Sequence, residues 1–114
     1  MRGEQIKAVL EKQYVDLTRP RVLYPSQNLS YEVDLQKPAG QRVQNIRIRQ
    51  QMIEMSQTFN VTVNSFMASG GDGFTEFNHA PVVSGGELDV DALSDYLIKN
   101  PGLTPPSTNR IRQL

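Results

Sequence analysis

The sequence contains no cysteine and only one histidine, His79. Without cysteine, the chain can form no disulfide bond, thiolate zinc site or iron–sulfur cluster, and it offers no catalytic thiol. With a single imidazole it cannot build a metal site from several histidines. His79 lies in a polar stretch between Glu76 and Pro81, where we expect a solvated loop residue rather than a catalytic base.

An excess of positive charge is also absent, because 12 Lys and Arg residues balance 12 Asp and Glu residues. Non-specific binding to nucleic acid or to an anionic membrane needs a basic surface, so we expect neither partner. No apolar run reaches the ~18 residues of a membrane span. Residues 1–5 lack the apolar core of a signal peptide, so we expect no membrane span and no signal peptide.

The composition that remains is that of one small globular domain, with 38% hydrophobic and 21% charged residues in a chain of 114. Apolar periodicity predicts a helix over 4–14, with Lys7 and Glu11 on the side opposite its apolar face. Alternating apolar residues predict three strands: one over 29–35, one that begins at 40–42 and ends at 48, and one over 58–65. A further helix is predicted near 90–99, with Asp89 or Asp91 as its N-cap. A short final strand is predicted around 110–112. The order α-β-β-β-α with short turns predicts an α+β domain with a mostly antiparallel sheet and flanking helices.

The glycine-rich segment Ser69–Gly73 is the one stretch whose composition requires a special explanation. It does not fit a P-loop, because no Gly-Lys-Ser/Thr follows, and it lacks the third glycine of the dinucleotide fingerprint. Gly70 and Gly71 would let a ligand approach the backbone closely and would leave Asp72 accessible. A carboxylate in such a place can accept two hydrogen bonds from a diol. The alternative is a plain turn in which Asp72 bonds to its own backbone.

Phe66 is the second candidate for a ligand contact. It follows the predicted strand 58–65 on the side of the polar Asn64, out of phase with the apolar Val63. An aromatic residue with this phase either packs under a helix or faces a ligand. Three other aromatic residues are predicted to belong to the core: Tyr31, Phe59 and Phe74.

The segment Asn64–Phe74 resembles a signature of the C-terminal domain of the 5′-nucleotidase family, which includes UDP-sugar hydrolases and 2′,3′-cyclic-nucleotide phosphodiesterases. Three other segments are similar to the same domain in order and spacing: 3–11, 29–43 and 88–97. The resemblance covers nearly the whole chain. It implies that residues 1–114 form a partial C-terminal domain and that the family's metallophosphatase domain is absent.

In that family, the metallophosphatase domain holds two divalent metal ions and performs hydrolysis, whereas the C-terminal domain binds the nucleotide. By motif position, the resemblance implies that Phe66 stacks on the nucleobase and that Asp72 holds the ribose hydroxyls. Gly70 and Gly71 would then serve close approach of the backbone. The family's second aromatic residue and its phosphate-binding arginines precede the matched region. We therefore expect no cofactor in this chain and no catalysis by the chain alone.

The resemblance also implies partners and a location. The partners would be a nucleotide or nucleoside and the metallophosphatase domain of a parent chain. The truncated surface predicts self-association through the N-terminal helix or an edge strand. The implied location is periplasmic or extracellular. Two other hypotheses stay open: an interaction module that reuses the fold, and a relative of the thiosulfohydrolases, whose C-terminal domain is similar.

Overall fold

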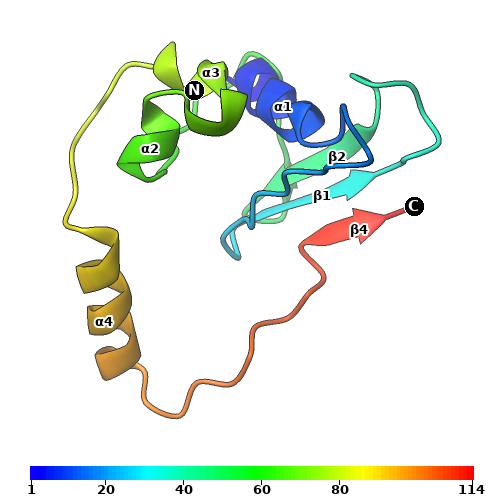
Figure 1. The fold of residues 1–114 in the computed structure, drawn as a ribbon. Helices are drawn as coiled ribbons and strands as arrows, with labels where there is room; N and C mark the ends of the chain where they lie inside the picture. Colours follow the sequence, from blue (N-terminus) through cyan, green and yellow to red (C-terminus); the bar gives the residue numbers. More distant parts are fainter.

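The computed structural model describes residues 1–114 and contains one four-stranded sheet (Figure 1). The strands are β1 (Leu29–Val33), β2 (Val43–Ile48), β3 (Gln51–Met52) and β4 (Ile111–Gln113), in the order β3-β2-β1-β4. β2 is antiparallel to both β1 and β3, whereas β4 runs parallel to β1. The predicted α+β class with a mostly antiparallel sheet is therefore confirmed, and so is the short final strand.

A bulge in β2 explains why the apolar residues of this strand do not alternate. The register with β1 shifts between Ser30 and Glu32, where one residue of β1 faces two residues of β2. One of those two is Asn45, whose φ of 52° lies in the left-handed region that asparagine tolerates better than most residues. The extra residue turns both Val43 and Ile46 to the buried face, although they are three positions apart.

The helix α1 (Gly3–Lys12) packs its apolar face on this sheet. It buries Ile6 and Leu10 at i, i+4 spacing, and Tyr14 just beyond the helix joins the same cluster. The helix ends two residues before the predicted position, at Lys12. The sheet contributes the rest of the cluster: Tyr31, Val33, Val43, Ile46 and Ile53.

Glu11 corrects the prediction that this residue lies on the exposed side of the helix. The residue is 6% exposed. Its two carboxylate oxygens accept hydrogen bonds from the backbone N–H groups of Arg42, at 3.1 Å, and Val43, at 2.7 Å. The cause is that the chain entering β2 presents two N–H groups to the helix, and a carboxylate satisfies both.

The predicted strand over 58–65 is wrong. Thr58 forms only an isolated bridge with Arg2, and the backbone of Phe59 exchanges hydrogen bonds with Met1 at 2.8 and 2.7 Å. The strand beside β2 is instead β3, which the sequence did not predict. Because β2 is paired on both edges, the segment 58–64 finds no place beside it and pairs with the N-terminus. Phe59 is consequently only partly buried against the core.

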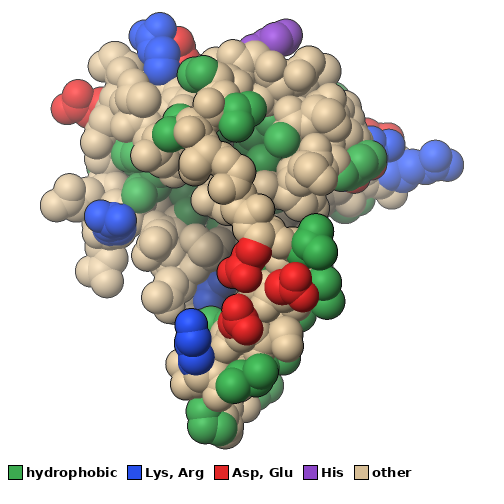
Figure 2. Space-filling view, turned by 90° about the vertical axis from the view of Figure 1, so that its left-hand side faces the viewer, with side chains coloured by type: hydrophobic (Ala, Val, Ile, Leu, Met, Phe, Trp, Pro, Cys, Tyr) green, Lys and Arg blue, Asp and Glu red, His purple; other side chains and the backbone are tan.

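The helix α4 (Asp89–Lys99) lies apart from the sheet and buries none of its residues, as Figure 1 shows. Its position in the sequence agrees with the predicted helix near 90–99, but its N-cap is Leu88. The Asp89 carboxylate accepts a hydrogen bond from the N–H of Val90, at 2.8 Å. Figure 2 shows acidic side chains on the outward face of this helix and hydrophobic side chains along its flank and lower end. No helix of the chain is long and apolar enough to span a membrane.

Candidate functional site

The glycine-rich segment folds as a compact loop between three short helices. These are α2 (Ser65–Ala68), the 3₁₀ turn η1 (Gly71–Gly73) and α3 (Thr75–Asn78). Asn64 starts α2, because its side-chain oxygen accepts a hydrogen bond from the N–H of Met67 at 2.9 Å. Phe74, directly after η1, anchors the loop in the interior. The residue is 1% exposed, and the centre of its ring lies 6.3 Å from that of Phe77. The prediction that Phe74 belongs to the interior is confirmed.

Phe66 lies in helix α2 and not at the end of a strand, so the argument from strand phase does not apply to it. The residue is 58% exposed. The ring covers Gly71 so closely that a Cβ added there would lie 2.5 Å from Phe66 Cε1. Gly71 therefore has no side chain because the Phe66 ring occupies that space. The Cδ1, Cε1 and Cζ side of the ring thus lies against the loop backbone, while the residue stays more than half exposed.

Asp72 follows directly after Gly71, and its backbone has a φ of 56° and a ψ of 20°. Its side chain is 59% exposed. No backbone N–H donates to its carboxylate, so the plain turn with an internally bonded aspartate is not what forms. Gly70 has a φ of 86°, in the left-handed region that favours glycine, and a Cβ added there would lie 3.7 Å from its nearest neighbours.

Two cations from the other end of the chain hold this loop. Lys12, the last residue of α1, donates to the carbonyl of Gly73 at 2.8 Å and pairs with Glu76 at 2.8 Å. Arg21 Nη1 donates to the carbonyl of Asp72 at 2.9 Å and lies 4.0 Å from its Oδ1. Neither residue is recognisable from the sequence, because Lys12 lies 61 positions before Gly73 and Arg21 lies 51 positions before Asp72, which leaves no local signal.

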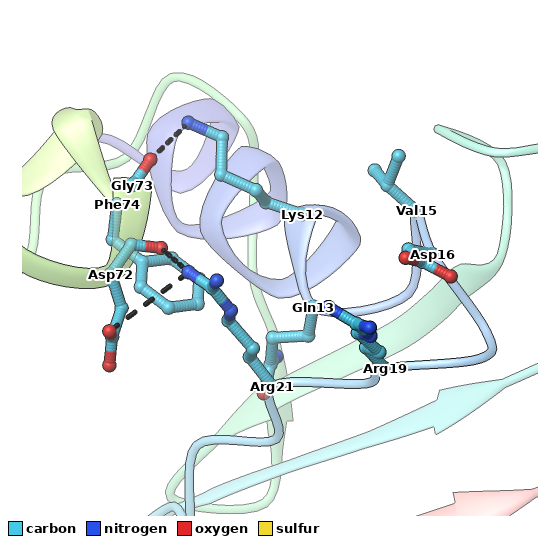
Figure 3. Close-up of a pocket in the computed structure, with 9 residues that line it drawn as sticks. All are labelled: Lys12, Gln13, Val15, Asp16, Arg19, Arg21, Asp72, Gly73 and Phe74. Atoms are coloured by element: carbon cyan, nitrogen blue, oxygen red, sulfur yellow. Dashed lines mark hydrogen bonds and ion pairs between the residues drawn. The ribbon is translucent and has the colours of Figure 1, made fainter.

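Asp72 also lines a groove of about 380 Å³ between the glycine loop, the end of α1 and the segment that follows it (Figure 3). Nine residues line the groove and only two of them are hydrophobic: Lys12, Gln13, Val15, Asp16, Arg19, Arg21, Asp72, Gly73 and Phe74. Phe66 is not among them. The aromatic ring therefore lies against the loop at Gly71, while Asp72 lines the groove.

The other candidate residues add no chemistry to this loop. His79 is exposed and ends α3, as its predicted loop position suggested. No group of three His, Asp or Glu side chains is placed to hold a metal ion. Tyr14 and Tyr31 share a buried hydrogen bond of 2.8 Å, and burial raises the pKa of both hydroxyls. These tyrosines lie in the core, away from the loop.

Phe66 and Asp72 are thus both exposed, within one short loop region that borders a polar groove. Residues 1–79 match the 5′-nucleotidase C-terminal domain family. The chain belongs to that family. The matched region includes the whole of the glycine loop.

Known proteins that resemble the chain extend this result. A 5′-nucleotidase-related protein of Glossina morsitans morsitans is 28% identical over 96% of this chain and 22% of its own length. The crystal structure of a 5′-nucleotidase precursor from Thermus thermophilus superposes with a TM-score of 0.89 and 32% identity. That match covers 100% of this chain and 24% of the other. The chain therefore spans less than a quarter of the length of either protein.

The structure of a sulfate thiohydrolase from Thermus thermophilus has the same fold over 100% of this chain and 21% of that one, with a TM-score of 0.71. Its sequence identity of 17% shows a shared fold and no more. The family assignment therefore rests on the 5′-nucleotidases.

Proposed function

We propose that this chain is the nucleoside-binding part of a 5′-nucleotidase-type hydrolase. In this proposal the Phe66 ring stacks on the nucleobase and the Asp72 carboxylate accepts hydrogen bonds from the ribose hydroxyls. Gly70 and Gly71 form the loop that joins the two contacts. A metallophosphatase domain of the parent chain, with two divalent metal ions, would hydrolyse the phosphate ester.

The observation that supports this proposal is the placement of Phe66 against Gly71. The contact holds the ring next to the residue that precedes Asp72. The side chains of both residues are more than half exposed. A nucleoside has its base and its ribose diol a few bonds apart, so contacts from adjacent points of one loop suit it.

The isolated chain should bind weakly, because it offers one stacking partner. Arg21 is the only cation that lies within 4.0 Å of the Asp72 carboxylate, so the loop offers little charge to a phosphate group. Base stacking on one aromatic ring is worth ~1–3 kcal/mol. We therefore expect dissociation constants in the millimolar range, at about 1 mM or weaker.

The experiment is a titration of the isotopically labelled chain with adenosine, followed by amide chemical shifts in NMR spectra. We expect the largest shifts between residues 64 and 74. Phe66→Ala should weaken binding by about 5- to 150-fold, the equivalent of one lost stacking contact. Tyr24→Ala is the matched control, since Tyr24 is an aromatic residue that is 93% exposed and lies outside the loop. Shifts that concentrate elsewhere, or equal effects of the two variants, would contradict the proposal.

We further propose that the chain forms an interface with another polypeptide, and the exposed surface of α4 supports this. Leu93 and Leu97 lie at i, i+4 spacing and are 57% and 52% exposed. The apolar face of α1 is already packed on the sheet. The partner surface we propose is therefore α4 together with the edge strand β4, and its occupant is the remainder of the parent chain or a second copy. The family resemblance further supports a periplasmic or extracellular parent.

A further inference from the structure

The conformation of the Asp72 loop is fixed from outside the loop. The carbonyls of Asp72 and Gly73 are consecutive, and each accepts a hydrogen bond from a different cation, Arg21 and Lys12. A non-glycine residue at φ 56° costs roughly 1–2 kcal/mol relative to the ordinary helical region. A contact that holds the Asp72 carbonyl therefore acts on the one non-glycine residue of the loop that has a positive φ.

We propose that Arg21 is a positioning residue for Asp72 and thereby sets the preference of the site for a ribose with free 2′ and 3′ hydroxyls. This inference rests on the proposed function. Arg21 fixes the backbone of Asp72 through the carbonyl, and its Nη1 stays 4.0 Å from Oδ1. That distance is too long for a hydrogen bond, so the carboxylate oxygens remain free to accept bonds from a diol.

Figure 3 shows Arg21 extending from the segment after α1 toward Asp72, with dashed lines to both its carbonyl and its carboxylate. The neighbouring Lys12 holds Gly73 in the same way, but it is also paired with Glu76. Arg21 makes its one ion pair with Asp72. Its removal should let the carboxylate swing and should let the backbone leave the left-handed region.

Arg19 provides the matched control. It lines the same groove and carries the same charge, but its side chain makes no hydrogen bond or ion pair. Arg21→Met and Arg19→Met remove equal charge from the groove, and only the first removes a contact with the loop. Arg21→Lys keeps the charge and one donor.

The experiment compares adenosine with 2′,3′-dideoxyadenosine, by NMR titration of the wild-type chain and these three variants. We expect the wild type to bind adenosine more tightly than the dideoxy analogue. In Arg21→Met the ratio of the two dissociation constants should fall by about fivefold, because exposed ion contacts contribute little energy. Arg21→Lys should restore part of the preference, and Arg19→Met should keep it. A merely structural role would weaken both ligands equally and leave the ratio unchanged, which would overturn the inference.

A second readout needs no ligand. Loss of the hydrogen bond from Arg21 should move the carbonyl ¹³C resonance of Asp72 in Arg21→Met and leave it in place in Arg19→Met. If the wild type fails to bind adenosine, the proposed function fails for the isolated chain, and this resonance still decides whether Arg21 positions the loop. An unchanged Asp72 carbonyl in Arg21→Met would overturn the inference whatever the titrations show.

Discussion

A single methyl group at Gly71 should displace the Phe66 ring while leaving the rest of the domain intact. The added Cβ would lie 2.5, 2.6 and 2.7 Å from three atoms of the ring. Carbon atoms pack at ~3.5–4.0 Å, so the ring must move by about 1 Å. Because the side chain is 58% exposed, it can rotate toward solvent without disturbing the core.

The expected effects of Gly71→Ala differ for stability and for binding. Since the ring can give way, the free energy of unfolding should fall by about 1 kcal/mol at most, near the low end for overpacking. Adenosine affinity should fall by about 5- to 150-fold, because stacking worth ~1–3 kcal/mol depends on the position of the ring.

Gly70→Ala is the informative comparison. Gly70 has a φ of 86°, and the nearest atom to an added Cβ is 3.7 Å away. This variant should lose roughly 1–2 kcal/mol of stability through backbone strain, with the ring undisturbed. Thermal unfolding followed by circular dichroism gives the stabilities, and adenosine titration gives the affinities. If Gly71→Ala bound adenosine as the wild type does, or if Gly70→Ala lost more affinity, the proposed role of the ring would be refuted.

Three further predictions follow from the core and from α4. Glu11→Gln should lower the free energy of unfolding by about 1–3 kcal/mol in urea titrations, because an amide cannot accept both backbone N–H groups that the buried carboxylate accepts; a change within error would contradict the pairing. Burial raises the pKa of Tyr31 and Tyr14, so the folded state keeps protons that the unfolded state releases. The contribution of these two hydroxyls to stability should therefore be fully present below the unfolded pKa of about 10 and be lost above it. Urea unfolding between pH 8 and 11 should show a shallower fall for Tyr31→Phe, and equal slopes would count against it. Leu93→Asp should reduce self-association in sedimentation experiments without changing the melting temperature, since the side chain is 57% exposed, whereas Asp95→Ser on another face of α4 should have no effect; self-association that persists in Leu93→Asp would place the contact elsewhere.

The sequence predicted those parts of the fold that follow from local periodicity. The helix α1 and the strand β1 have regular apolar spacing, and their predicted positions agree with the structure to within two residues. The strand predicted at 58–65 failed for a physical reason. Its alternation is as regular as that of β1, but β3 is the strand that pairs with the free edge of β2. No local pattern shows which of the two segments forms that pair.

The candidate site divides in the same way. Asp72 and Phe66 are candidates from the sequence, because a glycine-rich loop and an aromatic residue out of phase with its predicted strand stand out in it. The contact between the Phe66 ring and Gly71 depends on α2 being a helix, which a four-residue segment does not reveal. Arg21 reaches the loop only through the tertiary fold, and Glu11 could not be recognised as buried, because its partners are backbone groups more than 30 positions away.

The central claim is that one nucleoside contacts both Phe66 and Asp72, and the most direct test is the transfer of magnetisation between bound adenosine and the chain. Intermolecular nuclear Overhauser effects should connect the base protons H2 and H8 to the Phe66 ring, and the ribose protons H2′ and H3′ to the β-protons of Asp72. The account predicts both sets in one complex. Base contacts to Tyr24 or to α4, with none to Phe66, would contradict it.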